Sequence, residues 1–248
     1  NYYRNYYREI AHRAKRIITV SEFSKNDLCE VYDIGSEKID VIYNGVGRQF
    51  RALSETEITA NRKFFAQSSP YFLFVGSIHQ RKNLPNMMKA FTDFRSSTGA
   101  EMKFIIAGAR RWWNEEMENA FEGSPFKSDI QFIGRVSDDQ LPGLTGSAFA
   151  LLFASRFEGF GIPIVEAMQC GVPVITSNAS SMPEVAADAA LLVDPDSVDS
   201  ICDAMKKIFA DASLRKSLSE KGMARAKLFS WEVSARKLRE SIEKTISH

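Results

Sequence analysis

The chain has 248 residues, of which 44% are hydrophobic and 25% are charged, a composition typical of a globular protein. Lys and Arg number 32 and Asp and Glu number 31, so the net charge of +1 provides no long-range field to attract a polyanion, and nucleic acid is not expected as a partner. No apolar run reaches the roughly 18 residues that would span a bilayer.

Cysteine and histidine are too sparse to predict a site. The three cysteines are odd in number and widely spaced, which favours reduced thiols in a cytosolic setting over a disulfide framework. The histidines are scattered at His12, His79 and His248, so neither a zinc cluster nor a nucleophile triad is predicted. Acid–base chemistry must therefore come from carboxylates or from groups outside this sequence.

The chain begins without methionine, and tyrosines alternate with arginines in its first eight residues as in the middle of a helix. We therefore expect a fragment of a longer protein. Apolar runs rich in Val, Ile or Phe then predict eight strands, at residues 17–20, 39–43, 71–75, 103–107, 130–133, 148–153, 172–176 and 190–193. Amphipathic segments predict helices at residues 22–32, 84–96, 114–121, 138–146 and 162–170.

This alternation of strands and helices predicts an α/β fold, with a Rossmann-like, doubly wound parallel sheet. Residues 70–228 form the continuous block that can bury its own core. A strand–helix–strand segment at residues 1–46 precedes it, and residues 47–69, which have no strand pattern, are interpreted as an interdomain linker with a helical portion. The tail from residue 198 is mainly helical, and residues 229–248 form a C-terminal helix.

The most informative segment follows the strand at 148–153 and reads Glu158-Gly-Phe-Gly161-Ile-Pro163-Ile-Val-Glu166. Pro163 suits the first turn of a helix, where a missing N–H costs nothing. The two glycines therefore lie just before a helix N-terminus. The unpaired N–H groups and the positive end of the helix dipole at such a terminus predict an anion site, and the glycines let a phosphate approach.

Two glutamates flank this loop. The pattern places Glu166 in the first helical turn, and a bend between it and Glu158 would aim both carboxylates at one ligand. One would meet a sugar and the other a ribose, as an acidic residue does in dinucleotide-binding folds. Each also has an ordinary interpretation, since Glu166 could complement the helix dipole and Glu158 could cap the loop. Nothing in the sequence fixes the separation that a glycosidase pair needs.

Two cations, Arg81 and Lys82, follow the strand at 71–75, in a loop that begins with Gly76. Ligands of open α/β sheets bind at the carboxyl ends of the strands. A cation at the start of a helix is disfavoured by the dipole unless an anion lies between them, which makes a diphosphate a plausible ligand. The pair could hold that diphosphate without a metal. The alternative is that both side chains simply solvate the loop.

Other motifs are weaker. Neither a G-x-G-x-x-G fingerprint nor a P-loop occurs between a strand and a helix, which argues against a nicotinamide dehydrogenase or a P-loop NTPase. Asp194-Pro-Asp196 resembles a metal-binding aspartate pair, but the proline predicts a turn. The segment Arg110-Arg-Trp-Trp113 could stack bases, yet it is brief and is interpreted as a surface loop or a contact with a missing domain.

Residues 158–173 read E-G-F-G-I-P-I-V-E-A-M-Q-C-G-V-P and resemble the E-G-F-G-x-P-x-x-E-A-M-A-x-G-x-P-V motif of the retaining group 1 glycosyltransferases. The likeness extends to residues 18–24, 41–46, 75–84 and 230–232, so it covers nearly the whole chain. It implies one half of a GT-B fold, in which residues 70–228 bind a nucleotide-sugar donor. Residues 1–46 would end the N-terminal acceptor domain, whose other parts, with a cleft histidine, would be missing.

The family's residue roles carry over by position. Arg81 and Lys82 would bind the donor diphosphate, Glu158 the transferred sugar near the reacting carbon, and Glu166 the ribose. Backbone groups would complete the contacts with phosphate, sugar and base, and they belong to Gly76, Val136, Gly159, Phe160, Gly161 and Ile162. Many relatives have an arginine directly after the glycine at position 76, whereas this chain has a serine, so the phosphate contacts differ in detail.

The resemblance implies a retaining hexosyl transfer in which the departing phosphate helps to deprotonate the acceptor and Glu158 stabilises positive charge on the sugar. No metal or other cofactor is expected. GDP-mannose and UDP-glucose types of donor both stay open, and a glycan or lipid-linked acceptor would place a cytoplasmic enzyme peripherally at the inner membrane face. The alternatives are a nucleotide-sugar-binding module without transferase activity, and a phosphorylase or epimerase of the same architecture. The chain alone is expected to bind the donor weakly and to turn over little or not at all.

Overall fold

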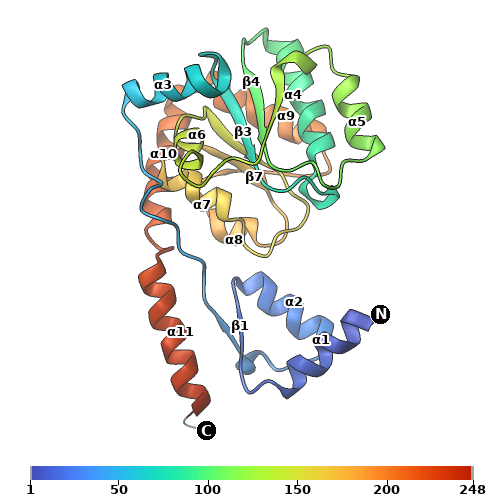
Figure 1. The fold of residues 1–248 in the computed structure, drawn as a ribbon, viewed down its shortest axis with the longest axis vertical. Helices are drawn as coiled ribbons and strands as arrows, with labels where there is room; N and C mark the ends of the chain where they lie inside the picture. The colour runs from blue at the N-terminus through green and yellow to red at the C-terminus, as the bar shows by residue number, and fades with distance from the viewer. Residues whose placement is uncertain (1, 247–248) are drawn as a thin grey trace.

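The computed structural model describes residues 2–246, which form an upper α/β domain and a smaller lower segment (Figure 1). The upper domain is built on one parallel six-stranded sheet in the order β5-β4-β3-β6-β7-β8. Its strands are β3 (Tyr71–Val75), β4 (Lys103–Ala107), β5 (Ile130–Gly134), β6 (Ala150–Phe153), β7 (Val174–Ser177) and β8 (Leu191–Val193). This arrangement confirms the predicted α/β class and doubly wound sheet.

The four central strands, β3, β4, β6 and β7, have sequences that explain their position. They are almost continuously apolar, and nearly all their side chains are buried, as expected where helices cover both faces of a parallel sheet. The chain winds outward from β3 to β5 and then returns to β6 on the other side of β3. The strand order therefore reverses between β3 and β6, the position at which open α/β sheets bind ligands.

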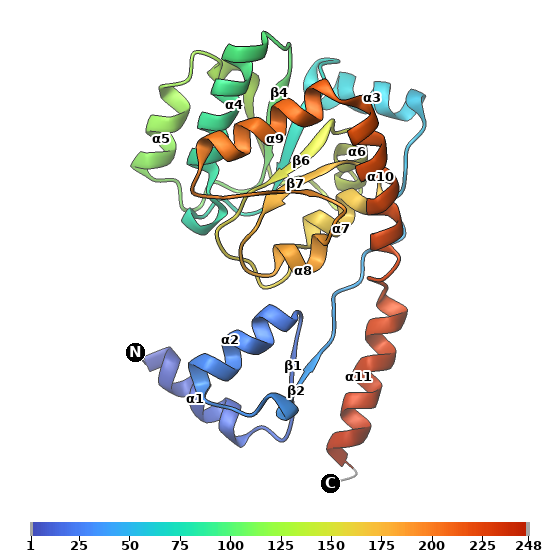
Figure 2. The ribbon, with the colours of Figure 1, turned by 180° about the vertical axis from the view of Figure 1, so that it is seen from behind.

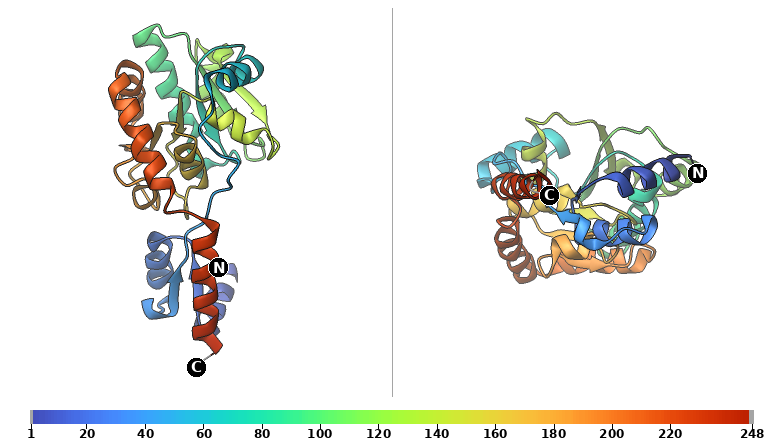
Figure 3. Two further views of the ribbon diagram at one scale, coloured as in Figure 1. Left: turned by 90° about the vertical axis from the view of Figure 1, so that its left-hand side faces the viewer. Right: turned by 90° about the horizontal axis from the view of Figure 1, so that it is seen from below.

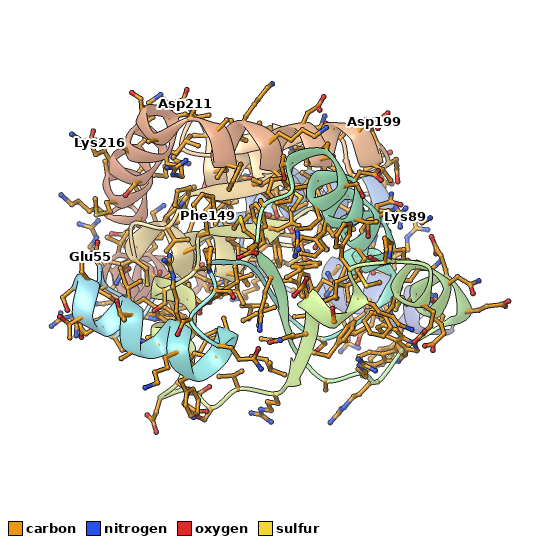
Figure 4. All side chains as sticks on the ribbon, turned by 90° about the horizontal axis from the view of Figure 1, so that it is seen from above. Glu55, Lys89, Phe149, Asp199, Asp211 and Lys216 are labelled. Carbon is orange, nitrogen blue, oxygen red and sulfur yellow. The ribbon has the colours of Figure 1, made fainter. Side chains whose placement is uncertain are left out.

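Two sets of helices cover the sheet (Figure 2). In the first, α4 (Leu84–Thr98) contacts α5 (Glu115–Glu122) and α9 (Val198–Ala210). In the second, α7 (Ile162–Gln169) contacts α6 (Leu141–Gly146), α8 (Met182–Ala186) and α10 (Ala212–Ala226). Figure 4 shows Glu55 and Lys89 at opposite ends of the domain, with α9 and α10 along one side. The short 3₁₀ helices are η1 (Ser36–Lys38), η2 (Gln80–Lys82) and η3 (Lys127–Asp129).

Residues 47–69, predicted as a linker with a helical portion, contain α3 (Glu55–Ala66). The helix begins with a capping box between Ser54 and Glu57. It contacts α6, and the Arg62 guanidinium donates a hydrogen bond to the Ser147 carbonyl (2.9 Å). The helical part of this segment therefore packs on the six-stranded domain.

The lower segment contains α1 (Tyr2–Arg13), β1 (Ile17–Thr19), α2 (Glu22–Tyr32) and β2 (Ile39–Val41), with β1 and β2 paired in parallel. The long α11 (Trp231–Ile246) extends down beside it, away from the sheet domain (Figure 3). Ser241 Oγ donates to Asp40 Oδ2 (2.6 Å), and Ser234 Oγ donates to the Tyr43 carbonyl (2.6 Å). These hydrogen bonds tie the end of the chain to its beginning.

Several predicted boundaries were wrong for local reasons. The helix predicted at residues 138–146 begins at Leu141, because the Ser137 carbonyl accepts from the Gln140 and Leu141 N–H groups in a turn, and Gln140 is the N-cap. The strands predicted to begin at 148 and 172 begin two residues later. Helix α8 was not predicted, since five residues show no helical period. No helix within residues 2–246 combines the length and apolar character needed to cross a membrane.

The ends of β3, β4 and β5 approach one another closely at a glycine. A Cβ atom on Gly108 would lie 1.8 Å from the Gly76 carbonyl oxygen. The Gly108 N–H donates to the Gly134 carbonyl (2.7 Å), and the Gly76 N–H donates to the Ala107 carbonyl (2.9 Å). Only a residue without a side chain fits at position 108, so this glycine fixes the edge of the sheet where the site lies.

We expect Gly108→Ala to reduce the free energy of unfolding in urea by about 3 kcal/mol, the upper end of the cost of overpacking, because the new methyl group meets backbone that cannot move aside. Gly99→Ala is the control, because its Cβ would enter open space and only the left-handed backbone (φ +65°) is disfavoured, at about 1–2 kcal/mol. Equal losses in the two variants would contradict the close approach.

Candidate donor site at the reversal of strand order

The loops that follow β3 and β6 meet through three charged side chains. Lys82 Nζ lies 2.6 Å from Glu158 Oε1, and Arg81 Nη1 lies 2.7 Å from Glu158 Oε2. Lys82 and Glu158 are only 8% and 7% exposed, whereas the Arg81 side chain is 44% exposed. In the structure, the Glu158 carboxylate is the anion that lies beside the two cations.

The environment of Lys82 lowers its pKa, and contact with Glu158 opposes that shift. Burial lowers the pKa of Lys82, while the charge of Glu158 and its hydrogen bond act in the opposite direction. Removing a charge from water is costly, and an oppositely charged group in contact is what offsets that cost. Lys82 can therefore be buried only because Glu158 lies against it, and Glu158 only because Lys82 does.

Backbone contacts hold the two loops in register. The Arg81 guanidinium donates to the Phe157 carbonyl (2.8 Å), and the Arg156 N–H donates to the Arg81 carbonyl (2.8 Å). The buried Asn83 amide donates to the carbonyls of Ala154 (3.0 Å) and Pro195 (2.6 Å). Asn83 has a left-handed backbone (φ 61°), which asparagine tolerates better than most residues.

The peptide groups around Glu158 are also fixed. Its N–H donates to Ser180 Oγ (3.0 Å), and its carbonyl accepts from Ser181 Oγ (2.9 Å). Ser180 has a left-handed backbone (φ 50°), which costs free energy that the surrounding contacts must offset. Sequence reasoning missed both serines, because a single hydroxyl contact has no periodic or spacing signal.

The glycine loop leads into α7 as predicted. Gly161 is left-handed (φ 94°) and immediately precedes the helix, and Pro163 lies in the first turn. The Phe160 ring is buried against Tyr43 (6.0 Å between centroids) and Phe229 (5.6 Å), and Ile162 is partly buried against the main core. The Phe160 side chain is therefore committed to packing, and the backbone role assigned to Gly159, Phe160, Gly161 and Ile162 stays a prediction.

Glu166 lies in the second turn of α7, not in the first as the sequence pattern suggested, because the helix begins at Ile162. The Glu158 carboxylate is bound by Lys82 and Arg81, and the expectation that both glutamates face one ligand stays a prediction. Burial, and secondly the charge of Asp138, raises the pKa of Glu166 to about 7. A carboxylic acid in this state can gain from a ligand whose hydroxyl groups stabilise its charged form.

A pocket of about 350 Å³ opens beside the charged cluster, at the ends of β3, β4 and β5. Its lining includes Gly76, Ser77, Gly108, Arg111, Arg135 and Val136. A Cβ atom on Gly76 would lie 3.5 Å from Lys82 Nζ, so this glycine separates the pocket from the buried ammonium group. Two of the predicted backbone positions, Gly76 and Val136, therefore face one cavity that adjoins the predicted diphosphate contacts.

The arginine–tryptophan segment is a surface loop, as predicted, and its side chains contact neighbouring rings. The Arg110 guanidinium lies 3.8 Å from the centroid of the Phe132 ring and 4.7 Å from that of Trp113, and the Trp112 ring meets His79 edge-on at 5.3 Å. Arg111 instead lines the pocket.

The aspartate pair forms the turn that its proline predicted. The Asp194 carboxylate accepts a hydrogen bond from the Asp196 N–H (2.9 Å).

We expect Glu158→Gln to lower the free energy of unfolding by about 3 kcal/mol, because it leaves the Lys82 ammonium buried without an anion. Adding Lys82→Met should recover most of that loss. Glu122→Gln is the control, since Glu122 pairs with Lys127 where both side chains are about half exposed, and should cost less than about 1 kcal/mol. Additive losses in the double variant would contradict coupling of the buried pair.

Glu166 predicts a pH dependence of stability. In the folded protein the pKa of Glu166 is about 7, above its ordinary value of 4.5. The protonated carboxyl group therefore stabilises the folded state. This stabilisation is fully present below pH 4.5 and is lost as the pH rises to 7. We expect stability to fall by on the order of 2–3 kcal/mol over this interval relative to Glu166→Gln. Urea unfolding of both proteins between pH 4.5 and 8 measures it, and parallel profiles would contradict a raised pKa.

Comparison with known proteins shows which family the chain resembles. Residues 55–225 match the family described as glycosyl transferases group 1, and residues 1–50 match glycosyltransferase family 4. O-antigen chain mannosyltransferase B of Escherichia coli is 33% identical over 220 residues, which are 88% of this chain and 58% of that protein. O-antigen chain mannosyltransferase RfbU of Salmonella typhimurium is 33% identical over 199 residues, 79% of this chain and 51% of that protein.

Solved structures share the fold. The crystal structure of Anabaena Alr3699/HepE in complex with UDP and glucose superposes with a TM-score of 0.84 at 19% identity, over 93% of this chain and 64% of that one. WaaG, a glycosyltransferase involved in lipopolysaccharide biosynthesis, superposes with a TM-score of 0.75 at 18% identity, over 91% and 61%. With more than half of its residues matched by the family model, the chain belongs to the group 1 glycosyltransferases.

Proposed function

We propose that this chain is the donor-binding portion of an enzyme that transfers a hexosyl group, with retention and without a metal, from a nucleotide-diphosphate sugar to a glycan or lipid-linked acceptor. One observation carries the proposal. At the reversal of strand order, two cations and a buried glutamate lie beside a pocket of about 350 Å³ whose lining combines small residues with Arg111 and Arg135. Family membership supports the reaction class.

The site divides into three parts along the sheet edge. The pocket past Gly76 and Val136 receives the nucleoside. The diphosphate lies next to it, against Lys82 and Arg81, where a bidentate guanidinium and a compact ammonium group can both meet phosphate oxygens. The transferred sugar then lies beside Glu158, and the nucleotide ribose lies toward Glu166.

Donor binding changes the partners of the cations. In the structure both cations contact Glu158, so a diphosphate that binds them competes with that carboxylate. The charge that develops on the departing nucleoside diphosphate is then stabilised by Lys82 and Arg81, and Glu158 is left to face the positive charge that develops on the sugar. These interactions strengthen as charge separates, which is how fixed charges lower a reaction barrier.

The proposal also concerns which sugar the donor carries. The two curated relatives are named as mannosyltransferases, which favours a mannosyl donor. This chain covers only 58% and 51% of their lengths, so the activity of the whole protein and its acceptor are part of the same proposal.

Calorimetric titration of the 248-residue chain with GDP-mannose, UDP-glucose, GDP and UDP, in the presence of a chelator, tests the donor site. We expect binding of at least one nucleotide sugar, and we expect Lys82→Ala and Glu166→Ala each to weaken it by about 1–3 kcal/mol, roughly 5- to 150-fold. Lys127→Ala, an exposed lysine paired with Glu122, is the control and should leave the affinity unchanged. Absence of binding by every ligand would contradict a donor site in this chain.

A further inference from the structure

The loop that contains Glu158 is held from two sides by different parts of the chain. Ser180 and Ser181, from the sheet domain, bind the two peptide groups of Glu158. On the other side lies the first turn of α2, from the lower segment. Ser21 Oγ donates a hydrogen bond to the Gly159 carbonyl (2.7 Å), and Ser24 Oγ approaches the same oxygen at 3.3 Å. A residue 138 positions away in sequence thus binds the peptide between Gly159 and Phe160, one peptide beyond those that flank Glu158.

The start of α2 is itself anchored to the sheet domain. The Glu184 carboxylate of α8 accepts hydrogen bonds from the Glu22 N–H (2.7 Å) and the Phe23 N–H (3.0 Å). A carboxylate at the positive end of a helix forms charge-assisted hydrogen bonds, which are stronger than neutral ones. The Phe23 ring also packs edge-on against Phe157 (5.5 Å between centroids). These contacts fix the position of Ser21 relative to the loop.

We infer that Ser21 is a positioning residue for Glu158. By holding the Gly159 carbonyl, it fixes the peptide between Gly159 and Phe160, the first beyond the two peptides that flank Glu158, and so limits backbone rotation at Gly159 on that side of the glutamate. Gly159 has no Cβ atom, so its backbone is free to rotate unless another group restrains it. Ser21 is fully buried, and its hydroxyl is the shortest contact to that carbonyl. The inference rests on the proposed role of Glu158 at the donor.

If Ser21 only stabilised α2, its replacement would have a different effect on the Glu158 loop. Its Oγ also accepts from the Ser24 N–H (3.0 Å), as the N-cap of α2. An N-cap needs only an acceptor oxygen, whereas the Gly159 carbonyl needs a donated hydrogen. If capping were the whole role, removing the hydroxyl would destabilise α2 and leave the Glu158 loop unchanged.

Hydrogen exchange of the ligand-free chain tests the restraint directly. We expect Ser21→Ala to accelerate exchange of the amides at residues 158–161 at least fivefold, because the Gly159 carbonyl loses the shorter of its two hydrogen bonds to α2 and keeps only the longer one from Ser24. Ser21→Thr, which keeps the hydroxyl, should restore slow exchange. Ser54→Ala removes a comparable N-cap from α3, outside this loop, and should leave it unchanged. Unchanged loop exchange in Ser21→Ala would overturn the inference.

Ligand affinities test the consequence for the donor. Since Glu158 faces the sugar, Ser21→Ala should weaken a nucleotide sugar about tenfold while leaving the corresponding nucleoside diphosphate within about twofold. Equal weakening of both ligands would indicate general destabilisation and would count against positioning. If the unaltered chain binds neither ligand, the proposed function fails, whereas the exchange experiment still decides whether Ser21 restrains the loop.

Discussion

The ion pair between Lys82 and Glu158 is the interaction on which the site depends. Neither residue could be buried alone, because an unpaired charge in the interior costs several kcal/mol. The pair forms only because the strand order reverses between β3 and β6, which brings the loops after those strands together. The sheet topology thus determines where the charges meet, and the charges in turn hold the loops that surround the pocket.

Residues farther from the ion pair hold these loops in place. Gly108 lets the ends of three strands converge, and Asn83 joins the β3 loop to the turn at Pro195. Ser180 and Ser181 hold the Glu158 peptide from the sheet domain, while the lower segment reaches the next peptide through α2. The proposed donor site consequently depends on both parts of the chain, although its charged side chains all come from one.

The sequence was most informative where it had a strong period or a long motif. The buried strands and the glycine loop before α7 were predictable, because apolar runs and a Gly–Pro pattern have few other structural meanings. Arg81, Lys82 and Glu158 could be selected by position, but not their mutual contact, which depends on sheet order. Ser21, remote in sequence from its contact, carried no comparable signal. Glu166 was placed one turn too early, since the start of a helix after a glycine loop cannot be read to the residue.

The chain passes between the two parts of the molecule twice, once before α3 and once before α11, and the two passages touch. The Val46 N–H donates to the Phe229 carbonyl (3.2 Å), and a Cβ atom on Gly45 would lie 2.3 Å from the Trp231 nitrogen. A single connection would let the parts swing and twist freely. Two connections that touch restrict that motion, and the contacts of α2 with Glu184 and with the Gly159 carbonyl attach the two parts at a further point.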